Sequence, residues 1–324
     1  MRRRTALALF GAAGAAAIAS RSVAQRRDRL VRLGYVGVSA NDPQLRWIRL
    51  GLTRSGWLEG RDYVVSARST GPELNRVPAL VDELLRERID ILLTAGLASS
   101  VVPIAQHVVP VVFGTSSDPV RAGIVKSFAL PGGNATGVSH MAYDLVGKRL
   151  QLLRDIAPTV RRAALLSSPQ HAGEEEERRV IFEAAGRLEL ELVPYHVNSK
   201  AEITAAMEAA VSAKCDSITS FADPITLTNR DMIAAKARQL NWASTFGRRD
   251  FCDAGGLASY GANFAEANAR LAYFVQKIAG GARAGELPVE VPTVVETVVN
   301  RNTAAAIGLT LTPAVLASAD ELIE

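Results

Sequence analysis

The stretch IDILLTAGLASSVVPIAQHVVPVVFGTSSDP, residues 89–119, decides the fold class of this chain. It contains two short apolar runs, Ile89–Ala95 and Val108–Gly114, separated by a helix-like segment. Both runs are nearly continuous rather than alternating, which is typical of parallel strands covered on both faces. Hydroxyl residues follow each run. The stretch therefore predicts a strand–helix–strand unit with its polar residues at the strand ends.

The same unit recurs along the chain in two series. Further strands are expected at Val31–Gly37, Tyr63–Ala67, Arg162–Leu166, Glu189–Val197, Ser217–Ala222 and Gly256–Tyr260, with helical stretches such as 174–188 and 202–214 between them. Alternating strands and helices predict an α/β fold with parallel, doubly wound sheets. About 300 residues exceed what one hydrophobic core usually holds, so two lobes are expected.

The end of the chain fits neither series. Leu271, Phe274, Val275 and Ile278 lie on one face of a predicted helix, which Gly280-Gly281 closes. A proline-bounded segment, 288–292, then leads into an expected strand at 293–299 and a final helix from about residue 303.

The first 24 residues have the layout of a bacterial export signal. Three arginines at 2–4 precede an Ala/Leu/Gly-rich run, and Ser22-Val23-Ala24 forms a small-x-small cleavage site. The apolar run is shorter than the roughly 20 residues that span a bilayer. We expect cleavage near Ala24 and a periplasmic protein; the twin-arginine and Sec routes both fit.

Loss of this segment removes the basic charge. The chain has 37 Lys+Arg and 33 Asp+Glu, and four of the arginines, at positions 2, 3, 4 and 21, leave with the signal. The expected mature protein is therefore balanced, which argues against nucleic acid as a partner. The two cysteines, Cys215 and Cys252, are expected to be free buried thiols, although export permits a disulfide.

Small polar residues at the strand ends are the candidate binding groups. Ligands of open α/β sheets lie at the carboxyl ends of the strands, and hydroxyls with helix-start N–H groups suit a carboxylate. Asp118 or Asp223 would suit an ammonium group. The alternative for both is ordinary helix capping, because each precedes a proline.

Signatures of enzymes and cofactors are missing from the sequence. It has no GxSxG elbow, no GxxxxGK[ST] loop and no GxGxxG fingerprint. It also lacks CxxC and HExxH, and its four histidines are scattered. We therefore expect no catalytic residues, no cofactor and no metal.

Several segments together resemble a known family. They are 118–125, with Asp-Pro and Arg-Ala-Gly-Ile-Val; 131–139, PGGNATGVS; 147–153, GKRLQLL; 254–261, AGGLASYG; and the close at 287–290 and 300–310. From about Leu30 to Glu324 the chain is similar to the ABC-transporter substrate-binding proteins that include tryptophan- and tyrosine-binding members.

The resemblance implies a periplasmic-binding-protein type I fold with two Rossmann-like lobes and three crossovers. Lobe 1 would comprise 30–139 and 262–286, and lobe 2 would comprise 140–261 and 287–324. The implied ligand-binding residues are Ser39, Thr94, Ala95, Ser99, Thr115, Ser116, Asp118, Ser139, Asp223 and Tyr260. Amino-acid-binding members tend to carry Asp-Asn where this chain has Asp223-Pro224, so another small carboxylate or amide is an alternative ligand.

The sequence thus predicts a monomeric, non-enzymatic binding protein. It would capture a small polar ligand, an amino acid or related carboxylate, between its lobes and deliver it to an ABC permease. One alternative is a periplasmic ligand sensor that presents the same fold to a signalling receptor. Another is a periplasmic α/β hydrolase, which would need a nucleophile–base pair.

Overall fold

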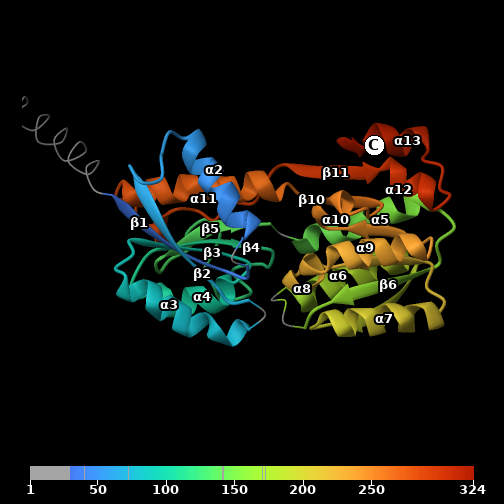
Figure 1. Cartoon of the computed structure of the whole chain (residues 1–324), viewed down its shortest axis with the longest axis horizontal. Coiled ribbons are helices and arrows are strands. Elements are labelled where there is room, and N and C mark those ends of the chain that lie inside the picture. Colours follow the sequence, from blue (N-terminus) through green and yellow to red (C-terminus); the bar gives the residue numbers. More distant parts are fainter. Residues whose placement is uncertain (1–29, 40, 72, 141, 170, 172) are drawn as a thin grey trace, which may run out of the picture.

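The computed structural model describes residues 30–39, 41–71, 73–140, 142–169, 171 and 173–324. The predicted export signal, 1–24, lies outside these residues. The described chain forms two α/β lobes side by side, each built on its own sheet (Figure 1). This confirms the predicted fold class. Among the described residues, no helix has the length and apolar character needed to cross a membrane.

The first lobe has a five-stranded, all-parallel sheet in the order β2-β1-β3-β4-β5. Its strands are β1 (Val31–Gly37), β2 (Tyr63–Ser69), β3 (Ile91–Ala95), β4 (Val111–Thr115) and β5 (Ala135–Ser139). Its helices are α2 (Pro43–Arg54), η1 (Leu74–Arg76), α3 (Val77–Arg86), α4 (Ala98–Ala105), α11 (Phe264–Ala279) and η2 (Ala284–Glu286).

The second lobe has a seven-stranded sheet in the order β12-β11-β10-β9-β8-β6-β7, with one antiparallel pair, β10–β11. Its strands are β6 (Arg162–Ser167), β7 (Glu191–His196), β8 (Ser217–Ser220), β9 (Ala243–Phe246), β10 (Ala258–Ala262), β11 (Val295–Asn300) and β12 (Glu321–Ile323). Its helices are α5 (Ala142–Ile156), α6 (Glu174–Arg187), α7 (Lys200–Ser212), α8 (Pro224–Thr228), α9 (Arg230–Gln239), α10 (Asp250–Asp253), α12 (Arg301–Ala306) and α13 (Pro313–Ser318).

Each sheet is covered on both faces. In β3, Ile91 and Leu93 pack on the side of α2 and α11, whereas Leu92 packs on the side of α3 and α4. Figure 1 shows these two helical layers above and below the sheet. Burial on both faces explains why the strands read as continuous apolar runs in the sequence. It also leaves the strand ends as the places where polar side chains reach a cavity.

Three crossings join the lobes: between β5 and α5, between β10 and α11, and between η2 and β11. The third begins with a segment that contacts the first lobe. Val289 still packs in the first-lobe core, and the Glu290 N–H donates to the carbonyl of Gly137 in β5. Val289 and Glu290 therefore still contact the first lobe on the way to β11.

Three short strands and one helix boundary differ from the sequence prediction. Strands β5, β9 and β12 were not predicted, because each is brief and lacks a long apolar run. In β5, Gly137 approaches β4 so closely that a Cβ there would lie 1.8 Å from the Phe113 carbonyl oxygen. The predicted final helix is divided into α12 and α13.

Both cysteines are free and buried, as expected.

A close helix crossing holds the discontinuous first lobe together. A Cβ added at Gly51 in α2 would lie 2.1 Å from the Ala269 carbonyl oxygen of α11. Gly51→Ala should therefore force the helices apart and destabilise the protein by about 1–3 kcal/mol, the usual cost of overpacking. Urea unfolding measures this change.

Gly186→Ala is the matched control for that substitution. Gly186 lies near the end of α6, and a Cβ there would meet no atom within 4 Å. Alanine should stabilise this exposed helical position by up to about 1 kcal/mol. Equal effects of the two substitutions would contradict the close-crossing argument.

Candidate functional site

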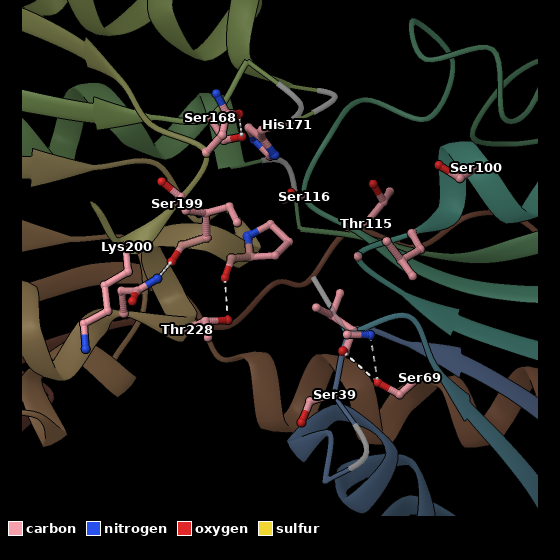
Figure 2. Close-up of a pocket in the computed structure, with 18 of the residues that line it drawn as sticks. Ser39, Ser69, Ser100, Thr115, Ser116, Ser168, His171, Ser199, Lys200 and Thr228 are labelled. Carbon is pink, nitrogen blue, oxygen red and sulfur yellow. Dashed lines mark hydrogen bonds between the residues drawn. The ribbon is translucent and has the colours of Figure 1, made fainter. Parts of the chain in front are cut away.

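A cleft between the lobes contains a cavity of about 630 Å³, here called the outer chamber. Loops after β1, β2, β3 and β4 line it on one side, and loops after β6, β7 and β8 line it on the other (Figure 2). The lining residues are Val38, Ser39, Ser69, Gly71, Gly96, Leu97, Ser100, Thr115, Ser116, Ser117, Ser168, His171, Asn198, Ser199, Lys200, Pro224, Ile225, Thr228 and Asn229.

A second cavity of about 330 Å³, here called the inner chamber, is lined in part by His140 and Phe264, which lie at two of the crossings. The two chambers share lining residues from both lobes, including Ser39, Thr115, His171 and Thr228, so they form one continuous cleft. Asp42, His140, Asp223, Arg248, Asp250 and Phe264 line the inner chamber but not the outer one.

His140 presents an unpaired acceptor to the inner chamber. Its Nδ1 lies 2.7 Å from the Thr115 carbonyl oxygen, which can only accept, so Nδ1 carries the proton. Burial, together with the positive charge of Arg248, lowers the pKa of His140 to about 4 despite the bond to the Thr115 carbonyl. The ring is therefore neutral, and its Nε2 lone pair has no hydrogen-bond partner among the described residues.

Arg248 supplies the opposite group, an unpaired donor. Its side chain is only 3% exposed, and its Nε donates to Asp250 at 2.9 Å. The guanidinium carbon lies 4.1 Å from the centroid of the Phe264 ring, whose other stacking partner is His140 at 4.2 Å. Nη2 has no partner among the described residues. Phe264 thus fixes a donor and an acceptor in the same chamber.

Asp223 begins α8 and also faces the inner chamber. One carboxylate oxygen accepts from the Thr226 N–H at 2.8 Å, an N-cap bond, while Oδ2 has no partner in the described chain. Burial raises the pKa of Asp223 to about 6. Asp42 is arranged similarly at the start of α2, and burial raises the pKa of its carboxyl as well. Asp223 therefore both caps the start of α8 and lines the inner chamber.

A buried charge network lies where the two chambers meet. His171 Nε2 lies 2.7 Å from an oxygen of Glu177, whose side chain is fully buried. Burial lowers the pKa of His171, but Glu177 and Asp223 outweigh it and the net shift is upward. Burial also lowers the pKa of the nearby Arg149 to about 10. The pair of His171 and Glu177 therefore lies at the junction of the chambers, which both include His171 in their lining.

The structure brings five of the ten sequence-predicted site residues into the cleft. Ser39, Thr115 and Ser116 line both chambers, whereas Ala95 and Asp223 line the inner one.

Four others lie elsewhere. The Thr94 and Ser139 hydroxyls are buried and donate to carbonyls of Val36 and Ser117. Asp118 accepts from the Val120 and Arg121 N–H groups in a turn, and Tyr260 packs against the second-lobe core. Ser99 is in α4, and its side chain is outside the described part of the structure.

Sequence reasoning missed the most distinctive inner-chamber groups. Arg248 follows β9, a four-residue strand, and its chemistry depends on Phe264 across a chain crossing. His140 follows β5, which was also unpredicted. The sequence offered one indication of their role, namely that each residue follows the end of a strand directly or after one further residue.

Two α/β lobes that enclose a polar cavity define a two-domain ligand-binding protein. Residues 38–323 match the family described as ABC transporter substrate binding protein. This chain belongs to that family, which confirms the resemblance seen in the sequence.

Individual relatives are distant in sequence. A tyrosine-binding protein of Clostridioides difficile (strain R20291) is 18% identical over 259 residues, 80% of this chain and 74% of that protein. A conserved domain protein from Vibrio cholerae superposes with a TM-score of 0.83 at 23% identity. An ABC domain from Streptococcus pneumoniae, in complex with L-Trp, superposes with a TM-score of 0.83 at 20% identity. Each alignment covers 91% of this chain and all of the other. These structures share the periplasmic-binding-protein type I fold.

The raised pKa of Asp223 predicts a pH-dependent cost in stability. The folded carboxyl titrates near pH 6 rather than at its usual 3.8, so stability is lost as the pH rises from about 4 to 6. Asp223→Asn removes this charge and should be more stable than wild type by about 3 kcal/mol above pH 6, with the gain vanishing near pH 4. Denaturant unfolding across this range measures the difference; parallel stability curves would contradict the assignment.

Proposed function

We propose that this protein is an exported solute-binding protein. It captures a small zwitterion, an amino acid or related carboxylate, between its lobes and delivers it to an ABC permease. The observation that carries the proposal is the set of buried polar atoms without described partners on three residues, His140, Asp223 and Arg248, that line one chamber between the lobes. Such atoms cost free energy when left unsatisfied, and a ligand that pairs them recovers it. The L-Trp complex and the tyrosine-binding relative support an amino acid head group.

The chemistry of the inner chamber matches a zwitterion. An ammonium group has three donors, which suit Asp223 Oδ2 and His140 Nε2, both without partners in the described chain. A carboxylate suits the Nη2 donor of Arg248, which lines the same chamber. Charge-assisted bonds of this kind are shorter and stronger than neutral ones. A ligand bearing both groups therefore satisfies donor and acceptors together.

Closure of the lobes is part of the proposal. Arg121 of the first lobe pairs with Glu176 of the second at 2.7 Å, and Arg248 lies 6.0 Å from the first-lobe Trp47 ring. Contacts of exposed ion pairs contribute at most about 1 kcal/mol, so ligand binding must drive most of the closure. We propose segments near 139–142, 260–263 and 286–292 as the hinges.

The proposal also covers the bounds of the two lobes, the cellular location of the protein and its oligomeric state. We assign residues 30–139 and 262–290 to the first lobe and 140–261 and 291–324 to the second. The protein would act as a periplasmic monomer that binds its ligand without transforming it. The closed form would dock on the permease.

A comparison of two aspartates can distinguish a role in ligand binding from a role in helix capping. Asp118 and Asp223 both precede proline and cap backbone N–H groups, but only Asp223 lines the cleft. Because Asn caps about as well as Asp, Asp223→Asn should keep the fold and weaken amino acid binding by about 1.5–3 kcal/mol. Calorimetry with the best-binding compound from a panel of amino acids, small carboxylates and sugars measures the loss.

Asp118→Asn is the control and should leave the affinity unchanged. Equal affinities for wild type and Asp223→Asn would refute the ammonium assignment. A panel in which no amino acid or carboxylate binds would refute the proposed ligand class.

Export makes a separate prediction. The mature protein should begin at or within two residues of Gln25, because signal peptidase cleaves after a small-x-small triplet. Mass spectrometry of the protein recovered from the periplasm checks the new terminus. Periplasmic protein that retains its first 24 residues would contradict it.

A further inference from the structure

Arg248 belongs to the second lobe but packs against the first. It follows β9, and its Nε donates to Asp250 of the same lobe at 2.9 Å. Its guanidinium carbon lies 4.1 Å from the ring centroid of Phe264 and 6.0 Å from that of Trp47. Phe264 begins α11 and Trp47 lies in α2, two helices that pack together in the first lobe (Figure 1). The position of this cation therefore depends on both lobes.

The contact between Arg248 and Phe264 is buried. The Arg248 side chain is only 3% exposed, and cation–π contacts strengthen when the cation is withdrawn from water. A guanidinium is planar and stacks on aromatic rings, so the Phe264 ring and the Asp250 carboxylate together restrict its orientation. They thereby also restrict the direction of Nη2, which is buried and has no hydrogen-bond partner among the described residues.

His140 is held differently, although it stacks on the same ring. Its ring centroid lies 4.2 Å from that of Phe264, with the two planes 8° apart. Its backbone N–H and its Nδ1 both donate to the Thr115 carbonyl oxygen, at 2.8 and 2.7 Å. These two bonds lie within the first lobe and do not involve Phe264. Loss of the Phe264 ring should therefore disturb Arg248 more than His140.

The second group proposed for the ammonium end is also independent of Phe264. Asp223 is held at the start of α8 by the bond from the Thr226 N–H, at 2.8 Å. The inner chamber thus combines two kinds of support. The acceptors for an ammonium group are fixed within their own lobes, whereas the donor for a carboxylate is fixed across the two lobes.

We propose that Phe264 is a positioning residue for the ligand carboxylate, because its ring holds the Arg248 guanidinium in the orientation in which Nη2 meets that carboxylate. The proposal rests on the proposed function and deepens it. Since Phe264 and Arg248 come from different lobes, the carboxylate site is complete only when the lobes are together. Carboxylate binding then favours the closed form through its higher affinity for that form.

The test compares an amino acid with the amine that lacks only its α-carboxylate. The probes are the common L-amino acids and, for the one that binds most tightly, the corresponding amine, for example tyramine for L-tyrosine. Calorimetry on the mature wild-type protein should show the amino acid bound about ten times or more tightly than the amine, as expected for a hydrogen bond to a charged group.

Phe264→Leu should reduce this preference for the carboxylate. Phe264 is half-buried and leucine keeps an apolar side chain there, so the fold should persist. The affinity for the amino acid should fall roughly fivefold or more, the effect of losing a buried cation–π contact. The affinity for the amine should stay within about twofold of wild type, because Asp223 and His140 keep their own supports. A loss of mere structural integrity would weaken both probes.

Tyr273→Leu is the matched control. Tyr273 is a half-buried aromatic residue of the same helix, and the Arg270 guanidinium carbon lies 3.8 Å from its ring centroid. It belongs to the described lining of neither chamber. The substitution removes a similar cation–π contact from α11 and should leave both affinities unchanged.

A double-mutant cycle tests whether Phe264 acts through Arg248. Arg248→Gln removes the guanidinium and should itself abolish most of the preference for the carboxylate. In that background, Phe264→Leu should change the affinity for the amino acid by less than about twofold, because the group that it positions is gone. Additive losses in the double variant would overturn the proposal.

The outcomes separate the proposal from the function on which it rests. An unchanged preference in Phe264→Leu, or an equal loss of amino acid and amine binding, would overturn the positioning role and leave the proposed function intact. Absence of binding by every amino acid, or equal wild-type affinities for amino acid and amine, would overturn the positioning role and the proposed zwitterionic ligand together. A loss confined to the amino acid and absent from Tyr273→Leu would support both.

Discussion

Burial of both sheets on both faces is the constraint on which the rest of the structure depends. A strand such as β3 has its side chains packed into two different cores, so it has no face left for chemistry. Polar side chains enter the cleft only where a strand ends and the backbone turns toward a helix. The ligand site is therefore assembled from loops, and its chemistry depends on how the two sheets are placed against each other.

That constraint also determines how much of the molecule the sequence predicts. Long apolar runs predicted most strands and both lobes, and strand-end position predicted Ser39, Thr115, Ser116 and Asp223 as cleft residues. The same reasoning placed Thr94 in the site, although its hydroxyl turns to the Val36 carbonyl within the sheet. Sequence position alone does not say to which side a strand-end residue points.

The inner chamber was harder to predict because its geometry is non-local. His140, Phe264 and Arg248 form one stack, yet they come from three segments separated by two chain crossings. No spacing in the sequence marks that stack. Tyr260, by contrast, follows a family pattern but packs in the second-lobe core.

Ligand recognition and stability oppose each other at Asp223. Its second oxygen is buried without a described partner, and burial raises the carboxyl pKa. A neutral residue would suit the empty protein better. An aspartate there sacrifices folded-state stability, as functional sites commonly do, and under the proposed function a bound ligand would restore the missing interactions. The empty and the loaded protein should thus differ more in stability than their shared fold suggests.

The passage of α11 back to the first lobe has a consequence for how the chain folds. Leu271, Phe274 and Val275 fill the core between α2 and the first sheet, although about 180 residues separate them from β3. The first lobe begins to be synthesised first, yet its core is incomplete until residues 140–261 of the second lobe and then α11 have been made. Such long-range contacts slow folding. We therefore expect nascent chains to remain open until α11 is available, and the amino-terminal half alone to be unable to close its core.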